Sequence, residues 1–525
     1  MGAQSTGHLD ARIVIRQAMH THPYTPENVR HVAIHYLMGR GAAGMAGFIT
    51  VLLLVRFMDV HNYAAYIALS GVAALSGILA SLGMERVLSR YVPEGRIYRP
   101  VTQLSHFIWV TSAIRLAAAL LIVLLLYMLW PAVDRFLAVA EFKVFPVSLA
   151  CFIVAEALYQ HFSAVLQALV MQKVLTRLLV IQWAGRLLLI AIIVSMKSAI
   201  SWQEALWIFA IPELLGVAGF IFVIRRHLQG LAEPEAADGS WPEYGKVAGV
   251  GQHNYGFTLL AAPAQGYFMK VLTAAYLPVE VVAAYGFFIS VAEKARQFIP
   301  LHFFYGLIEP MMVAGYLKDR DFSALSYRCQ LLYKSNLLLM IPAIAWVAVA
   351  GDSIVVLMTG GKFAGLSWML ALVMVQLAIG SHVVLLQLIL NSLEKSRLLL
   401  KASMYALFIM LLVMAVSANT DPVYLLFSPA VFSLVMNFYI LGQLARDGHA
   451  YKPSRHMLGS ILWSGVASAA FATLMVGALP WQPGAFVMAA VSLAVVMIIY
   501  GTSLWLMKAI SLEEILSVRA LVVRK

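Results

Sequence analysis

The sequence has 525 residues, of which 62% are hydrophobic and only 12% are charged, which excludes an ordinary soluble globular protein. The net charge of +12 is spread between apolar runs and forms no basic patch, so we expect no nucleic-acid partner. The two cysteines, Cys151 and Cys329, provide neither a disulfide framework nor a metal cluster and are expected to be buried free thiols.

Residues 1–31 are polar and contain no apolar core followed by a cleavage site, so we do not expect a signal peptide. We predict a cytoplasmic N-terminal tail. Within it, Asp10 to His20 forms either a short amphipathic helix on the membrane surface or part of a disordered tail.

About fourteen apolar stretches follow, most of them close to the roughly 20 residues that a helix needs to cross a bilayer. None shows the period-2 alternation of a membrane strand, which favours a helical bundle over a barrel. The predicted spans are residues 32–57, 63–83, 105–130, 147–171, 178–196, 203–224, 248–269, 281–307, 329–350, 367–390, 402–417, 424–443, 458–478 and 485–507.

Lysine and arginine are distributed unequally between the connections. With the N-terminus inside, about 25 lie in the predicted inner segments and about 5 in the outer connections. Those in the inner segments include Arg86, Arg90, Arg96 and Arg99, which we expect at the cytoplasmic surface. This positive-inside distribution predicts an even number of spans and places both termini in the cytoplasm.

The polar linker 225–247 divides the membrane region into two halves. We predict an N-terminal lobe of six spans (32–224), a C-terminal lobe of six spans (248–443), two peripheral spans (458–507) and a cytoplasmic tail (508–525). The predicted fold is therefore an all-α polytopic membrane protein with two pseudo-symmetric six-helix lobes around a central cavity.

A short internal repeat supports this division. Phe57 to Val60, followed by Ala64 to Tyr66, is similar to Tyr276 to Val279, followed by Ala283 to Tyr285, at an offset of about 219 residues. An even number of crossings between the copies makes the repeat parallel. Chance similarity between apolar segments is the alternative explanation.

Several charges fall inside predicted spans, where they usually face a bundle interior or a watery cavity. The predicted helix 281–307 contains Glu293, Lys294 and Arg296, and Glu293 lies about 18 Å from its start, near mid-bilayer. The alternative is that this helix ends early and its charges lie at the cytoplasmic interface. Three further intramembrane arginines are Arg40, Arg115 and Arg186.

Several segments near the N-terminus resemble the opening of a known family. They are Gly39-Arg40-Gly41, Arg56-Phe57-Met58, Tyr63 to Tyr66, Gly83-Met84-Glu85-Arg86 and Ser89 to Glu94. The chain thus resembles the polysaccharide flippases, the O-antigen and exopolysaccharide repeat-unit translocases of the multidrug/oligosaccharidyl-lipid/polysaccharide (MOP) superfamily. The motifs cover about the first 70 membrane residues, and the span count and two-half layout extend the resemblance to the whole chain.

The resemblance implies translocation of an undecaprenyl-diphosphate-linked oligosaccharide across the bacterial inner membrane by alternating access of two lobes. It also implies coupling to H⁺ or Na⁺, and contacts with a polysaccharide polymerase and a chain-length regulator. Related flippases line a cationic cavity with arginines of the first and eighth spans, which correspond here to Arg40 and to Lys294 or Arg296. An anionic diphosphate needs such cationic partners where water is scarce.

For Arg115 and Arg186 two roles remain open, which are substrate binding and structural pairing with a buried glutamate such as Glu156 or Glu213. Candidate coupling residues are Glu156, Glu213 and Glu293 for a proton, and Asn254 with Asn437 for sodium.

We expect no enzyme activity and no cofactor, because the sequence has no phosphate loop, no HExxH motif and no metal-spaced cluster. The largest outer connection, Pro131 to Pro146, is too short for the site of a glycan polymerase or ligase. Two other transporters remain as alternatives. A lipid II flippase should show a different first-span motif, and a cation-coupled multidrug exporter should have an acidic, aromatic cavity.

Overall fold

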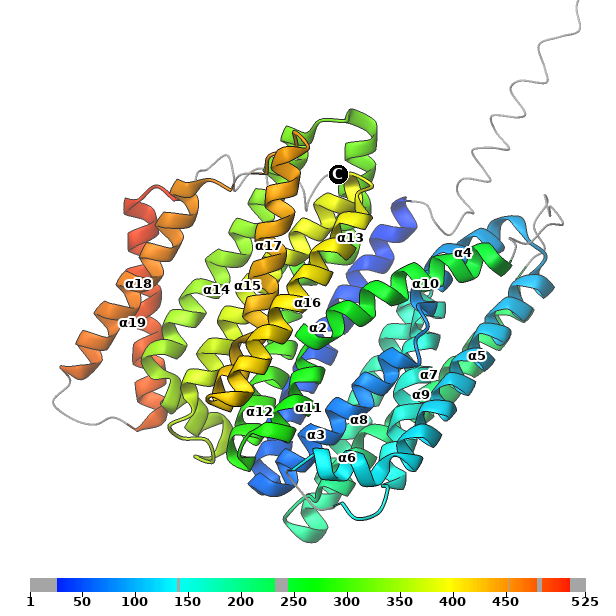
Figure 1. The fold of residues 1–525 in the computed structure, drawn as a ribbon, viewed down its shortest axis with the longest axis horizontal. Helices are drawn as coiled ribbons and strands as arrows, with labels where there is room; N and C mark the ends of the chain where they lie inside the picture. Colours follow the sequence, from blue (N-terminus) through cyan, green and yellow to red (C-terminus); the bar gives the residue numbers. More distant parts are fainter. Residues whose placement is uncertain (1–25, 139–141, 232–243, 452, 479–483, 510–525) are drawn as a thin grey trace, which may run out of the picture.

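The computed structural model describes residues 26–138, 142–231, 244–451, 453–478 and 484–509, and these form a helical bundle (Figure 1). The helices of the first half are α2 (Pro26–Phe57), α3 (Val60–Leu79), α4 (Met84–Tyr98), α5 (Val101–Met128), α6 (Trp130–Phe136), α7 (Val147–Ala168), α8 (Gln172–Lys197) and α9 (Trp202–Gln229). Those of the second half are α10 (Tyr244–Ala261), α11 (Gly266–Tyr276), α12 (Val279–Arg296), α13 (Pro300–Asp319), α14 (Phe322–Thr359), α15 (Ser367–Ser392), α16 (Ser396–Asn419), α17 (Ser428–Arg446), α18 (Arg455–Gly477) and α19 (Ala485–Leu506). The predicted amphipathic segment Asp10 to His20, most of the linker and nearly all of the C-terminal tail lie outside the described residues.

Twelve of the described helices are long and apolar enough to cross a membrane. Large apolar side chains such as Leu121, Leu215, Phe438 and Trp505 are exposed on the outside of the bundle. So much exposed apolar surface suits contact with lipid rather than water. The prediction of an all-α polytopic membrane protein is confirmed.

The seventh and eighth predicted spans, 248–269 and 281–307, are not continuous helices, so this part of the prediction is wrong. The first is interrupted by a 3₁₀ turn at Ala262–Ala264, which contains Pro263. The second ends at Arg296, and α13 begins at Pro300. Proline lacks the amide hydrogen that a helix interior needs, but it suits the first turn of a new helix. The alternative that the helix ends early is the one that the structure supports.

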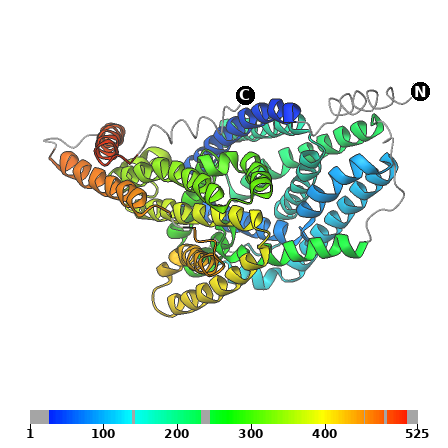
Figure 2. The ribbon, with the colours of Figure 1, turned by 90° about the horizontal axis from the view of Figure 1, so that it is seen from above.

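Helix α2 lies between the two halves and packs on α8 of the first half and on α12 of the second (Figure 1). Helices α18 and α19 pack on each other and on α14 at one edge of the bundle (Figures 1 and 2). Helix α10 crosses from α4 to α16 and so contacts both halves. Helices α2 and α14 both finish at the same side of the bundle, which we call the outer end because the predicted orientation places it outside. The opposite side is called the inner end.

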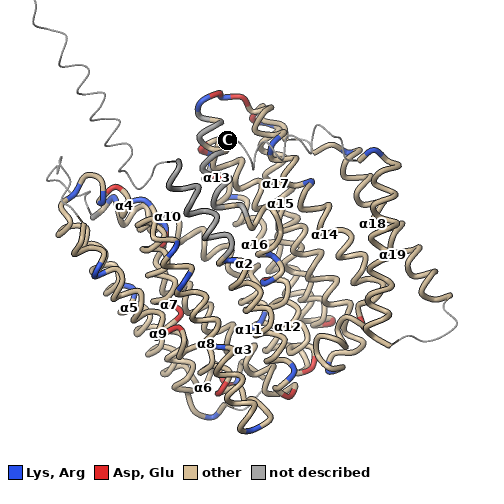
Figure 3. The backbone as a smooth tube through the Cα atoms, turned by 180° about the vertical axis from the view of Figure 1, so that it is seen from behind, with Lys and Arg blue, Asp and Glu red and all other residues tan. Residues whose placement is uncertain are grey.

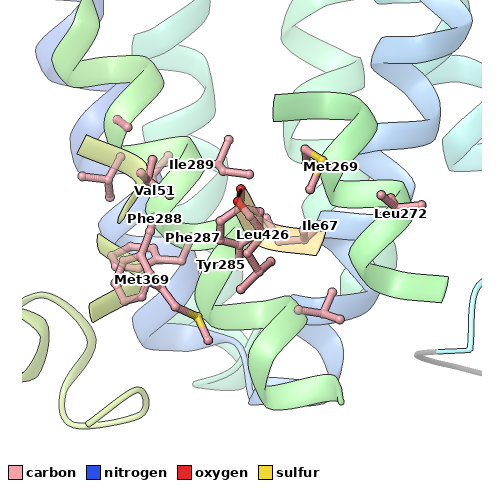
Figure 4. Close-up of a cluster of buried hydrophobic side chains, with 14 of the residues drawn as sticks. Val51, Ile67, Met269, Leu272, Tyr285, Phe287, Phe288, Ile289, Met369 and Leu426 are labelled. Carbon is pink, nitrogen blue, oxygen red and sulfur yellow. Dashed lines mark hydrogen bonds between the residues drawn. The ribbon is translucent and has the colours of Figure 1, made fainter. Parts of the chain in front are cut away.

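The two copies of the short repeat lie at the start of α3 and α12, which begin at Val60 and Val279 and pack against each other. Two glycines allow the halves to approach closely there. A Cβ atom on Gly286 would lie 2.2 Å from the Ile67 side chain, and one on Gly71 would lie 2.8 Å from the carbonyl oxygen of Tyr267. Buried aromatic and aliphatic side chains fill the space around this contact (Figure 4).

Candidate substrate cavity

A cavity of about 1030 Å³ lies among α2, α4, α7 and α8, and Gln297 between α12 and α13 also lines it. Its charged lining residues are Arg40, Glu85 and Arg86. The cavity reaches the protein surface near the inner end, where Arg86 is exposed. A cationic pocket of this size can hold a phosphorylated headgroup together with part of a sugar chain.

Glycines in α2 determine where Arg40 lies. Gly39 packs so closely on α8 that a Cβ atom would lie 1.7 Å from Cγ2 of Thr176, which itself lines the cavity. One helical position further along, Arg40 also lines the cavity. The Gly39–Arg40 pair therefore combines close packing of α2 on α8 with a cation in the cavity wall.

Trp183 of α8 lines the same cavity and contacts two cations. The Lys294 ammonium nitrogen lies 4.8 Å from the ring centroid, and the Arg186 guanidinium carbon lies 4.2 Å from it. Gly47 of α2 leaves room for this arrangement, because a Cβ atom there would lie 3.1 Å from the Trp183 ring and 3.2 Å from Cε of Lys294. Cation–π contacts of this kind hold positive charge next to an aromatic wall.

The three charges at the end of α12 have different surroundings. Glu293 contacts Lys270 of α11, with 3.7 Å between the carboxylate oxygen and the ammonium nitrogen. Lys294 lies on the ring of Trp183, which lines the cavity. Arg296 is exposed, and none of the three residues is itself among those that line the cavity. The sequence-predicted site residues of the eighth span are therefore separated, and Lys294 is the one that contacts a lining residue through a cation–π contact.

Arg186 of α8 donates a hydrogen bond to Glu213 of α9, and both side chains are buried. The guanidinium also lies 4.8 Å from the ring centroid of Phe209. The second carboxylate oxygen of Glu213, Oε2, is buried and accepts no hydrogen bond from a donor in the described residues. Glu156 of α7 is a second carboxyl group close enough to interact electrostatically with Glu213.

Arg115 of α5 is fully buried and contacts groups of the protein itself through Nε and Nη2, while its Nη1 has no hydrogen-bond partner in the described residues. It donates to the Ala157 carbonyl oxygen at 3.1 Å and to Gln160 at 3.3 Å, and it lies 3.5 Å from a carboxylate oxygen of Glu85. Gln160 in turn donates to Glu156 at 2.5 Å. Arg186 thus has one of the structural partners that the sequence suggested, whereas the carboxylate beside Arg115 is that of Glu85 and not of Glu156 or Glu213. Neither arginine lines the cavity. Figure 3 shows that positively and negatively charged residues occur along the helices of the first half as well as at their ends.

Asn254 and Asn437 occupy different environments. The Asn254 amide donates to the Val250 carbonyl oxygen and faces a second, smaller pocket beside Arg90. Asn437 is buried in the second half, where Oδ1 lies 3.0 Å from Nδ1 of His382. The structure does not bring these two asparagines together into one cation site.

Sequence reasoning predicted only Arg40 among the residues that line the cavity, and the residues it missed include Glu85, Arg86, Trp183 and Gln297. Arg86 was expected at the cytoplasmic surface because it lies in a polar connection, yet that connection forms the amphipathic helix α4, one face of which lines the cavity. The strong amphipathic pattern of residues 84–98 was the available signal, since such a helix must cover an apolar or enclosed surface. Arg99, expected at the same surface, is buried.

No protein-family model matches this sequence, and no curated protein is significantly similar to it. Solved structures do match its fold. The lipid II flippase MurJ in an inward closed conformation aligns with a TM-score of 0.67 and 10% identity, over 90% of this chain and 98% of that one.

Two multidrug transporters align with the chain less closely than MurJ does. An inward-facing MATE family transporter of the MOP superfamily aligns with a TM-score of 0.55 and 10% identity, over 79% of this chain and 98% of that one. A mutant of the Vibrio cholerae MATE transporter VcmN aligns with a TM-score of 0.53 and 16% identity, over 81% of this chain and 99% of that one. The chain therefore has the fold of MOP-superfamily transporters. At these identities the similarity concerns the fold alone.

Proposed function

We propose that this protein is a flippase that moves undecaprenyl-diphosphate-linked oligosaccharide repeat units across the bacterial inner membrane during surface polysaccharide synthesis. The observation that carries this proposal is the cavity of about 1030 Å³ with Arg40 and Arg86 in its wall. Two arginines suit a diphosphate because each guanidinium can donate two parallel hydrogen bonds to phosphate oxygens.

The rest of the cavity wall suits a sugar chain. It contains the rings of Tyr159 and Trp183 and the amides of Gln160, Gln167 and Gln172. Sugar hydroxyl groups both donate and accept hydrogen bonds, as glutamine amides do. In this proposal the phosphates lie against α2 and α4, while the first sugars lie between α7 and α8.

The transport cycle we propose is alternating access of the two halves, coupled to an ion. The pair Glu156 and Glu213 is our candidate for a coupling proton, because these two neighbouring carboxyl groups lie inside the bundle and Oε2 of Glu213 is buried with no hydrogen-bond partner in the described residues. The same proposal includes contacts with a polysaccharide polymerase and a chain-length regulator. It also places both termini in the cytoplasm.

The substrate class can be tested in a strain that lacks the gene for this protein and is complemented with variants of the protein. Arg40→Ala and Arg86→Ala are expected to abolish surface polysaccharide and to accumulate the lipid-linked repeat unit, while immunoblots show normal protein levels. Arg90→Ala is the matched control, because Arg90 lies on the same helix as Arg86 but faces the second pocket. Normal export by both alanine variants would remove this cavity from the mechanism.

A second candidate function is lipid II translocation, favoured by the fold similarity to MurJ. Both candidate substrates carry a diphosphate, so they differ in their sugar portion. Rescue of a strain depleted of its lipid II flippase, without restoration of surface polysaccharide in the deletion strain, would favour this candidate.

A further inference from the structure

Two cations join the halves at the outer end. The Lys362 ammonium group, in the turn after α14, donates to the carbonyl oxygens of Val55 at 2.8 Å, Arg56 at 2.7 Å and Met58 at 2.6 Å. Arg56 of α2 donates in the opposite direction, to the carbonyl oxygens of Met358 at 3.3 Å and of Leu357. Each half therefore places a cation on the C-terminal carbonyls of a helix in the other half. We call this pair of contacts the outer clasp.

The chemistry of helix ends explains why the outer clasp is a specific contact. The last four carbonyl groups of a helix have no partner inside the helix, and they carry the negative end of its macrodipole. An ammonium group has three N–H donors, and Lys362 directs them at three such carbonyl oxygens around the end of α2. At the end of α14, Gly360 adopts a left-handed conformation with φ of 69°, which ends the helix where Arg56 reaches it.

Beneath the outer clasp lies a plug of aromatic side chains that excludes water from the contact between the halves. Tyr63 of α3 packs on Phe287 of α12 and on Phe363, with ring centroids 6.4 Å and 6.5 Å apart. Phe288 packs on Phe363 at 6.4 Å, and all four side chains are buried. Figure 4 shows Phe287 and Phe288 in this cluster.

The outer clasp itself is at the surface, since Arg56 and Lys362 are both exposed. Water can therefore replace these hydrogen bonds when the halves separate, so breaking them leaves no buried charge without a partner. The candidate cavity, in contrast, reaches the surface near the inner end, at Arg86 and Ser89. The molecule is thus closed at the outer end while its cavity is accessible from the inner end.

We propose that Arg56 and Lys362 are gating residues, which hold the outer end closed while the cavity is open to the inner side and which part when the cavity opens outward. This inference rests on the proposed transport function, because it assumes that the halves alternate. It assigns to these two residues a task distinct from substrate binding, since neither lines the cavity.

Thiol accessibility tests the outer clasp without any substrate. In a chain carrying C151S and C329A, a reporter cysteine at position 287 monitors the outer plug, and a second one at position 89 monitors the inner mouth of the cavity. Each reporter is combined with Lys362→Met or Arg56→Met, and its labelling rate by a membrane-impermeant maleimide is measured in vesicles of both orientations. Tyr63→Cys serves as a second outer reporter in case Phe287→Cys does not fold.

Loss of either cation is expected to raise the labelling rate at position 287 about tenfold, which corresponds to a shift of about 1.4 kcal/mol toward the outward-open state. The rate at position 89 should fall at the same time, because the halves alternate. Lys197→Met is the matched control, since Lys197 is an exposed outer lysine that pairs with Glu204 of its own half. It should change neither rate.

Two results would overturn the proposal. Unchanged labelling at position 287 would show that the outer clasp does not hold the outer end closed. Faster labelling at both positions would show general loosening instead of alternation. Labelling needs no lipid-linked glycan, so it tests the gating proposal separately from the export experiments. Either proposal can therefore be refuted while the other is supported.

Discussion

Replacing Arg186 by methionine is expected to destabilise the protein strongly. The change keeps the apolar stem but leaves the buried Glu213 carboxylate without its cation, and it removes the contacts with the rings of Trp183 and Phe209. Breaking one side of a buried ion pair costs about 3–5 kcal/mol. Since native proteins are stable by only about 5–15 kcal/mol, we expect a large drop in membrane abundance.

The matched double variant, Arg186→Met with Glu213→Met, separates a structural role from a substrate-binding role. Replacing both partners of a buried ion pair by apolar residues is often neutral or stabilising, so the double variant should regain most of the lost stability. The assay is thermal unfolding of the purified protein in detergent, with Arg90→Met as an exposed control. A shift on the order of 5 °C or more is expected for the single variant.

The reasoning fails if the single variant unfolds at the wild-type temperature and reaches normal abundance. If that variant also lost export, Arg186 would bind substrate instead, which is the other role that its position inside a span allows. Equal destabilisation of the single and double variants would mean that packing around Trp183, and not charge pairing, holds α8 and α9 together.

Three further outcomes are expected. Arg40→Lys should retain part of the export that Arg40→Ala loses, because lysine keeps the charge without the planar fork; surface polysaccharide at equal protein level measures this. Glu156→Gln should abolish proton-coupled export yet leave thermal stability equal or higher, because the amide removes one of two neighbouring carboxyl groups and keeps a side-chain oxygen that can accept from Gln160. Burial acts to raise the pKa of Asp59, but hydrogen bonds from Asn62 outweigh it and hold that pKa below its ordinary value of 3.8. The Asp59 cap of α3 should thus add about 0.5–1 kcal/mol to the free energy of unfolding above pH 3.8, and this stabilisation should be lost as the pH falls through the lowered pKa. Asp59→Ala should therefore lower the unfolding temperature at about pH 7 but not in strong acid.

Most helices could be predicted from the sequence because a membrane span is defined by composition over about 20 residues. The break at Pro263 was missed, and the break before Pro300 was only an alternative prediction, because a window of that length averages over a single proline. An apolar stretch with one proline can be a kinked helix or two helices, and only packing against neighbouring helices decides between them.

The cavity could be predicted less completely, because sequence gives the depth of a residue along a helix but not the direction in which it points. Arg40 and Arg115 both lie inside spans, yet Arg40 lines the cavity and Arg115 is enclosed by Ala157, Gln160 and Glu85. The resemblance to flippases singled out Arg40, and nothing in the pattern separated Arg115 from it. Only the packing of α5 against α7 decides that Arg115 faces protein groups.

The two halves are joined by different contacts at the outer and inner ends. This difference affects whether the inward-open or the outward-open state is favoured. At the outer end, the outer clasp and the aromatic plug hold them. At the inner end, Tyr255 of α10 donates to the Leu79 carbonyl oxygen, and Gly251 packs against Gly83. Because α10 is separated from α11 by the turn at Ala262–Ala264, α10 can move away while α11 stays packed on α3. We therefore expect the inner end to open more readily than the outer end, and under the proposed function this is the end at which the substrate enters.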